Sequence, residues 1–251
     1  MKKTLNCVLD IGEQMLLSGA EVHRVEDSVN RMCVALGAAR VDCFIITSSI
    51  VVTLHGKDGS IHTETRRIQA STTDFHKLDR LNALSRRICA ENLSLEDIRK
   101  ELELIRRGKT YPFAAECVTY AVIAAAFTVF FGGGVIEGLV SALLGLLVRL
   151  VVLVSDKIVG NAIFTKFLSA LSITSLAYLF TFMGAVPTPD RVIIGNIMLI
   201  IPGLGFTNAL RDLFTGDSIA GILRLLEAAL SAVAIAAGYF AFIFLTGGIP
   251  F

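Results

Sequence analysis

The chain has 251 residues, of which 54% are hydrophobic and 18% charged, and its formal net charge is +1. Residues 1–110 contain 17 of the 23 Lys and Arg, 15 of the 22 Asp and Glu and all four His, whereas residues 111–251 are mainly apolar. This division excludes a soluble enzyme, a disordered chain and a secreted disulfide scaffold, and the lack of a basic excess argues against nucleic-acid binding. We therefore predict a small cytoplasmic α/β domain over residues 1–110, followed by a polytopic α-helical transmembrane domain over 111–251.

The N-terminus has the basic start of a signal peptide without its apolar core. Lys2 and Lys3 are followed by Asp10 and Glu13, which interrupt any apolar run. The five cysteines are scattered, with no Cys-x-x-Cys pair and no cluster of His, a pattern that argues against a zinc site or a disulfide framework. We therefore expect the first domain to be cytoplasmic, and we assign no metal and no cofactor.

Apolar residues recur at three- and four-residue steps from position 8 to 36, with a gap at Gly19. This periodicity predicts one long amphipathic helix, or two helices joined near Ser18–Gly19. Just after the gap lies a charged run that consists of Glu21, His23, Arg24, Glu26 and Asp27. Glu and His at such spacing are able to act in acid–base chemistry or bind a metal, but the chain has neither a nucleophile elbow nor a His-x-x-x-His pair. Alternating charges on a helix are most often a solvated face, so we favour a structural role and assign no catalytic residue.

The rest of the first domain is predicted to contain paired strands and then two helices. Residues 41–54 are rich in β-branched side chains and precede a glycine-rich turn, and the alternation over 60–68 predicts the partner strand. One helix is predicted through 78–88. Another begins after Ser94, with Asp97 three residues on as in a capping box, and continues to Ile105.

Five apolar stretches in residues 111–251 are long enough to span a membrane, which takes about 20 residues. They are the uncharged residues between Glu116 and Glu137, then 135–154, 167–189, 192–210 and 228–251. The basic residues near their ends, Lys157, Lys166 and Arg211, mark the cytoplasmic side. We therefore predict five transmembrane helices in the inner membrane, with the C-terminus outside.

Ionisable residues within spans are costly and usually face the interior of the bundle. For Glu137 we favour exposure to water near the outer surface. Arg149 either extends to the inner headgroups, which we favour, or offers a cation to an anionic solute. Glu116 lies at the interface or lines an inner vestibule. Any coupling to protons would fall on the carboxylates Glu116, Glu137, Asp212 and Glu227, and the sequence does not choose among them.

The fourth span contains Pro202 and Gly203, which interrupt helical hydrogen bonding. Four polar residues follow within three turns: Thr207, Asn208, Arg211 and Asp212. Broken helices at membrane depth are tolerated where the freed backbone groups meet protein or a water-filled cavity, and transporters use them to bind solutes. This segment is therefore either part of a substrate pathway, together with Arg149, or a packing kink.

Two motifs make the chain resemble the threonine/serine exporter family. The first is Ser18-Gly19-Ala20-Glu21-Val22-His23-Arg24-Val25-Glu26-Asp27, in which the family shows a glycine and then Arg-Val-Glu. The second comprises Pro202-Gly203, then Asn208-Ala209-Leu210-Arg211-Asp212-Leu213, then Gly216-Asp217 and Gly221. The resemblance implies a secondary transporter that exports small hydrophilic metabolites, either threonine/serine-type amino acids or C4-dicarboxylates such as succinate. It also implies a second membrane subunit, similar to the C-terminal half of fused exporters.

Two alternatives to an exporter stay open at this point. The first is a membrane-anchored enzyme whose cytoplasmic domain acts through Glu21, His23 and Glu26, and the second is a sensor or scaffold without a solute pathway. No Walker-type Gly-Lys-Ser/Thr loop is present, which argues against ATP-driven pumping. The expected partners are the lipid bilayer, a small-molecule substrate and the second subunit, with self-association as the competing arrangement.

Overall fold

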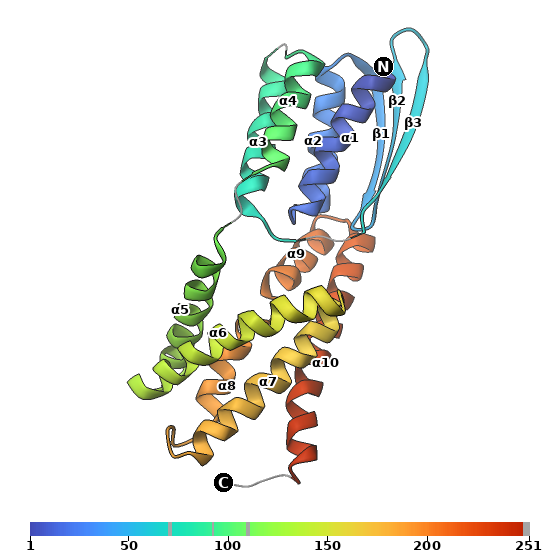
Figure 1. Cartoon of the computed structure of the whole chain (residues 1–251). Coiled ribbons are helices and arrows are strands. Elements are labelled where there is room, and N and C mark those ends of the chain that lie inside the picture. The colour runs from blue at the N-terminus through green and yellow to red at the C-terminus, as the bar shows by residue number, and fades with distance from the viewer. Residues whose placement is uncertain (70–71, 92, 109–110, 248–251) are drawn as a thin grey trace. The chain divides into compact units, whose positions relative to one another are not determined.

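A computed structural model describes residues 1–69, 72–91, 93–108 and 111–247 (Figure 1). The described chain is mostly helical, with one three-stranded sheet. It divides into two compact units, which are treated separately below. The first unit is Met1–Lys109 with Phe206–Leu225, and the second is Thr110–Gly205 with Leu226–Phe251. The predicted boundary at 110/111 adjoins residues 109–110, which lie outside the described residues, and the two-domain division at that point stays a prediction.

The first unit begins with two helices rather than one. They are α1 (Lys2–Leu17) and α2 (Val22–Ala35). Gly19, between them, has a φ of +88°, a left-handed conformation that glycine adopts without strain. Of the two arrangements predicted for residues 8–36, the second is therefore the correct one. Both helices bury their apolar faces in one core, which includes Leu9, Ile11 and Val25.

The sheet contains one strand more than the sequence indicated. Its strands are β1 (Ala38–Ile46), β2 (Ser49–Gly56) and β3 (Ile61–Arg67), antiparallel in the order β1-β2-β3. The stretch 41–54 is a hairpin, because Ile46 pairs with Ser49 across a two-residue turn. β-branched residues on both sides of Thr47–Ser48 concealed this turn. The predicted pairing of 60–68 with the preceding strand is confirmed by β2 and β3.

The two remaining helices of the first domain are α3 (Phe75–Ala90) and α4 (Leu95–Arg106). Each begins at a side-chain cap: Asp74 accepts a hydrogen bond from the amide of Lys77, and the predicted cap Ser94 accepts one from Asp97. The helices α1 and α2 lie between the sheet and the α3–α4 pair (Figure 1). This layered arrangement encloses a single apolar core, to which Ala220 of the later segment also contributes.

Among the described residues, four helices are long and apolar enough to cross a membrane. They are α5 (Phe113–Phe130), α6 (Val135–Ile158), α7 (Ala162–Phe182) and α10 (Ser218–Leu245). They correspond to the first, second, third and fifth predicted spans, although α10 begins ten residues earlier than residue 228. Residues 248–251, at the predicted end of that span, lie outside the described residues. The chain is therefore a multi-pass membrane protein.

The fourth predicted span, 192–210, is not one helix. It contains part of α8 (Asp190–Ile197), a series of tight turns, and most of α9 (Gly203–Phe214). At 1.5 Å per residue the 8-residue and 12-residue helices measure about 12 and 18 Å, too short to span singly. The break coincides with Pro202, which has no amide hydrogen to donate. The count of five spans is therefore not established.

The helices of the second unit approach one another closely at glycines, which have no side chain to keep the backbones apart. A Cβ atom on Gly145 of α6 would lie 2.7 Å from the Tyr120 carbonyl oxygen of α5, and one on Gly238 of α10 would lie 2.4 Å from that of Phe167 in α7. Gly195 brings α8 equally close to α5, because a Cβ there would lie 2.0 Å from the Thr128 hydroxyl oxygen. These glycines therefore serve contacts within the chain.

Candidate functional site

The first motif and residues 206–221 of the second meet inside the first unit, although about 190 residues separate them. Pro202 and Gly203 belong to the second unit. Residues 18–27 form the end of α1, the turn at Gly19 and the start of α2. Residues 206–225 form most of α9, a turn and the start of α10, and they belong to the same compact unit. The charged side chains of the two segments face one another, and we call these residues the motif cluster: Glu21, His23, Glu26, Arg211, Asp212, Asp217 and Arg224.

A buried ion pair lies at the centre of the motif cluster. The Asp212 side chain is 1% exposed, and its carboxylate lies 3.2 Å from a guanidinium nitrogen of Arg224, which is 13% exposed. Arg224 also donates a hydrogen bond to the main-chain oxygen of Ala20, with a length of 2.7 Å. The pair thus connects α9 and α10 to the turn between α1 and α2. Burial raises the pKa of Asp212, while Arg224 opposes that rise.

More exposed contacts surround this pair. Arg211 forms an ion pair with Glu21, the residue that precedes α2. His23 Nδ1 lies 4.0 Å from an Asp217 carboxylate oxygen. Burial and the neighbouring Asp217 raise the pKa of Glu26, and His23 opposes the rise. The cluster therefore combines carboxylates and cations in similar number, an arrangement suited to holding two chain segments together.

Two glycines of the second motif allow the close packing of α9 and α10. Gly216 has a φ of +97°, which permits the tight turn between the helices. A Cβ atom on Gly221 would lie 2.6 Å from the side chain of Leu213 and 2.9 Å from its main-chain nitrogen. Glycine at these two positions therefore permits the geometry that brings Asp212 and Arg224 together.

The other predicted pathway residues occupy more exposed positions around the break. Pro202 and Asn208 are half-buried, whereas Gly203, Thr207 and the motif residue Arg24 are exposed. Of the predicted pathway residues in 202–212, Arg211 and Asp212 join the motif cluster. The sequence analysis missed Arg224 as the partner of Asp212. The signal available was an arginine near the start of an apolar helix.

Arg149 belongs to a different group, in the second unit. Its Nε donates to the Glu116 carboxylate at 3.0 Å, and its guanidinium lies over the rings of Phe113 and Tyr120. The sequence proposed a role for each of these two charges but not their pairing. The separation of 33 positions places them on adjacent helices, α5 and α6, where a charge pair lowers the cost of burial.

The two remaining carboxylates proposed for proton coupling differ in burial. Glu137 is 4% exposed rather than water-exposed as predicted, because it caps α6: its carboxylate accepts a hydrogen bond from the Gly134 amide and lies 3.7 Å from Arg191. Glu227 is exposed on α10. The roles of both in proton coupling stay predictions.

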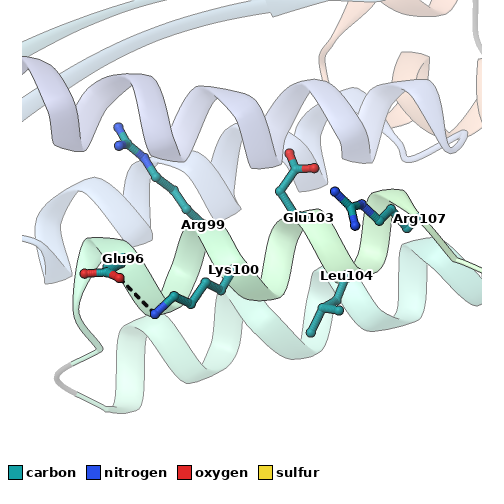
Figure 2. A pocket seen from close by; sticks show the side chains of 6 residues that line it. All are labelled: Glu96, Arg99, Lys100, Glu103, Leu104 and Arg107. Carbon is teal, nitrogen blue, oxygen red and sulfur yellow. Dashed lines mark ion pairs between the residues drawn. The ribbon is translucent and has the colours of Figure 1, made fainter.

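Two hollows lie outside the motif cluster. One, of about 420 Å³, follows the outer face of α4 and is lined by side chains of α4 and by Arg107, which follows the helix (Figure 2). Its Glu96 and Lys100 pair at 2.8 Å and are both largely exposed, as on an ordinary solvated face. The other, of about 230 Å³, lies among α5, α6, α7 and the residues that follow α8, and we call it the membrane cavity. The sequence did not predict it.

The sequence comparisons agree with the motifs. A family model described as "Putative threonine/serine exporter" matches residues 6–246. The chain belongs to the threonine/serine exporter family. A "Probable threonine/serine exporter" of Mycobacterium tuberculosis is 23% identical over 232 residues, which cover 90% of this chain and 43% of that relative. The chain thus spans less than half the length of that relative. No solved structure matches.

Membership of the family bears on the classes of function considered from the sequence. The predicted resemblance is confirmed, and the match extends over both units of the structure. The family model is described as one of exporters, so membership favours an exporter over a membrane-anchored enzyme and over a sensor or scaffold. The motif cluster, with its Glu21, His23 and Glu26, therefore belongs to a member of this family.

Proposed function

We propose that the chain is a subunit of an inner-membrane secondary transporter that exports threonine/serine-type amino acids or C4-dicarboxylates. The observation that supports this most is the family match over residues 6–246, which includes both motif segments. Two links to the first motif segment add to it: Arg211 pairs with Glu21, and Asp212 pairs with Arg224, which bonds to Ala20. They give the motif residues a shared structural role. In this proposal, the motif cluster forms the inner gate or its polar lining, and Pro202–Gly203 lines the solute path.

In the proposed orientation the first unit is cytoplasmic and the C-terminus lies outside. The basic residues Lys157 and Lys166 near the α6–α7 connection support a cytoplasmic position for that connection. The chain then returns to the cytoplasmic side through the discontinuous segment α8–α9, since α9 belongs largely to the first unit. Helix α10 makes the last crossing. A broken fourth crossing of this kind is known in transporters, where unwound segments adjoin the solute.

We also propose that a second membrane subunit completes the transporter. The described chain has a single Pro-Gly break and no second copy that would frame a midplane site as internal repeats do. The relative from Mycobacterium tuberculosis has more than half of its length beyond the matched part, which leaves room for a further membrane block. Self-association of this chain is the competing arrangement.

The test is efflux from cells and from liposomes. Cells that lack the chain should retain threonine, serine or succinate longer than the parent strain, and cells that overexpress it with its genomic neighbour should release one of them faster. Unchanged efflux of every solute in both strains would contradict export. In liposomes, the pair should support flux dependent on a proton gradient. Equal flux from this chain alone would contradict the second subunit and favour self-association.

A further inference from the structure

The membrane cavity has a volume and a lining suited to a small solute. Its volume of about 230 Å³ is below the roughly 300–1,000 Å³ of sites for drug-sized ligands. Its lining is largely apolar, with five residues that add polar groups. They are Tyr120 of α5, Asp156 of α6, and Thr165, Lys166 and Ser169 of α7. A small apolar cavity with a few convergent polar groups is the usual form of a binding site.

Lys166 is unusual among the cations of the membrane-spanning helices. Arg149 and Arg224 each have a carboxylate within 4.0 Å, and Lys157 at the end of α6 is exposed, whereas Lys166 is half-buried and has no carboxylate within 4.0 Å among the described residues. Its ammonium group instead donates to the hydroxyl of Ser231 on α10, at 2.7 Å. A half-buried cation in a membrane helix is costly unless an anion approaches it, so an anionic ligand group would be bound favourably here.

Ser169 supplies a second, independent observation. It follows Lys166 by three positions, so the two side chains share a face of α7. Ser169 is 0% exposed, and among the described residues its hydroxyl has no hydrogen-bond partner. The neighbouring hydroxyl of Thr165 is occupied, since it lies 2.8 Å from that of Ser155. A buried polar group with no partner in the protein is the group expected where a ligand supplies the missing bond.

Asp156 provides the opposite charge at the edge of the same cavity. It is exposed and has no cation within 4.0 Å among the described residues. Its carboxylate lies 3.4 Å from the Thr165 hydroxyl. The cavity thus offers a cation, a free hydroxyl and a carboxylate that are not paired with one another. That is the complement of a small zwitterion.

We propose that the membrane cavity binds a small zwitterionic α-amino acid, with its carboxylate at Lys166 and Ser169 and its ammonium group toward Asp156. A C4-dicarboxylate fits less well, because its second carboxylate would face Asp156. This inference rests on the proposed export function, and it names a binding position for that function. Asp156 and Ala162 flank the α6–α7 connection, which the proposed orientation puts on the cytoplasmic side. An exporter loads its solute from that side.

The test measures ligand binding by the purified full chain in detergent, with L-threonine and succinate as the probes and the shift of the thermal unfolding midpoint as the readout. Lys166→Gln should weaken threonine binding tenfold or more, because it removes a charged hydrogen bond. Ser169→Ala should weaken it about threefold to tenfold. Asp156→Asn should weaken threonine binding and strengthen succinate binding. Lys157→Gln is the matched control: Lys157 is exposed and does not line the cavity.

The outcomes separate this inference from the proposed function. If wild-type chain with its partner exports threonine, yet Lys166→Gln and Ser169→Ala bind it within twofold of wild type, the cavity assignment is wrong and export stands. If cells show no export while the purified chain binds threonine through Lys166, the export proposal is wrong and the cavity assignment stands. Failure of wild type to bind threonine overturns the cavity assignment. Should Lys166→Gln misfold, Ser169→Ala and Asp156→Asn decide, with Lys166→Arg as the variant that retains the charge.

Discussion

The two units of the chain differ in the number of their charged residues and in how exposed their ion pairs are. In the first unit most ion pairs are exposed, as with Arg87 and Glu101, whose side chains are 44% and 33% exposed. In the second unit charged residues are few. The Arg149 side chain is only 18% exposed and forms an ion pair with Glu116. Exposed pairs contribute little to stability, whereas buried charges depend on their partners. The informative residues are therefore the exceptions: a buried pair in the first unit and an unpaired lysine in the second.

The largest effect is expected at the buried pair of the first unit. Asp212→Asn leaves Arg224 charged and largely buried without a counter-ion, so we expect it to lower the free energy of unfolding by about 3 kcal/mol or more. Glu101→Gln, which removes one partner of an exposed pair, should cost at most about 1 kcal/mol. Thermal and denaturant unfolding of the detergent-solubilised chain compare the two. Equal losses would mean that burial does not distinguish these pairs.

A double variant shows whether that pair serves more than stability. Asp212→Leu with Arg224→Met replaces both charges by apolar groups, which often restores stability to a buried site. We expect unfolding near that of wild type, with efflux from cells reduced at least tenfold if the pair belongs to the gate. Efflux restored along with stability would make Asp212 and Arg224 purely structural.

The break between α8 and α9 is expected to affect transport more than folding. Replacing Pro202 with Ala and Gly203 with Leu favours a continuous helix, because it returns an amide donor and removes the flexible glycine. The protein should still insert, but efflux should fall about tenfold. Membrane fractionation checks insertion, and efflux checks function. Wild-type efflux from a correctly inserted double variant would assign the break to packing.

A moderate effect is expected at the exposed rim of the motif cluster. Arg211→Glu places two carboxylates together at Glu21, and we expect efflux to fall about threefold to fivefold, in keeping with the modest energy of an exposed pair. Adding Glu21→Arg restores opposite charges in reversed order and should recover most of the loss. If the second substitution worsens efflux instead, Arg211 acts through something other than its contact with Glu21.

Local sequence patterns predicted the parts of the fold that depend on neighbouring residues. Periodicity located the four helices of the first domain, the cap at Ser94 followed from hydrogen-bonding chemistry, and length with apolarity located α5, α6, α7 and α10. The sequence does not reveal the turn at Thr47–Ser48, because β-branched residues lie on both sides of it. The pattern at 192–210 also concealed the end of α8, since apolar composition does not distinguish a continuous helix from a broken one.

The site was less predictable, because it depends on residues distant in sequence. Resemblance marked Glu21 and Arg211 separately, but only the fold brings them together across 190 positions. From the sequence, Lys166 serves only as a marker of the cytoplasmic side, because lysines are common near the cytoplasmic ends of spans. Its significance depends on the lack of a carboxylate within 4.0 Å among the described residues and on the free hydroxyl of Ser169, and neither is visible along the chain.

The smallest effect concerns Glu26, the half-buried carboxylate of the motif cluster. Burial and the neighbouring Asp217 raise its pKa above the ordinary 4.5 in the folded protein, against the opposing charge of His23. The folded state therefore binds this proton more tightly than the unfolded state does, and stability falls as the pH rises from about 4.5 through the raised pKa. Asp212, whose pKa is also raised, acts in the same direction.

The variant Glu26→Gln removes the contribution of Glu26 to this pH dependence. The unfolding midpoint of the variant should therefore fall less than that of wild type between pH 4.5 and 7. Because Glu26 is only half-buried, we expect a difference below about 1 kcal/mol. Glu96→Gln, which removes a largely exposed carboxylate of the same domain, is the matched control. A steeper pH dependence in Glu26→Gln than in wild type would mean that Glu26 is held as a favourable anion within the cluster.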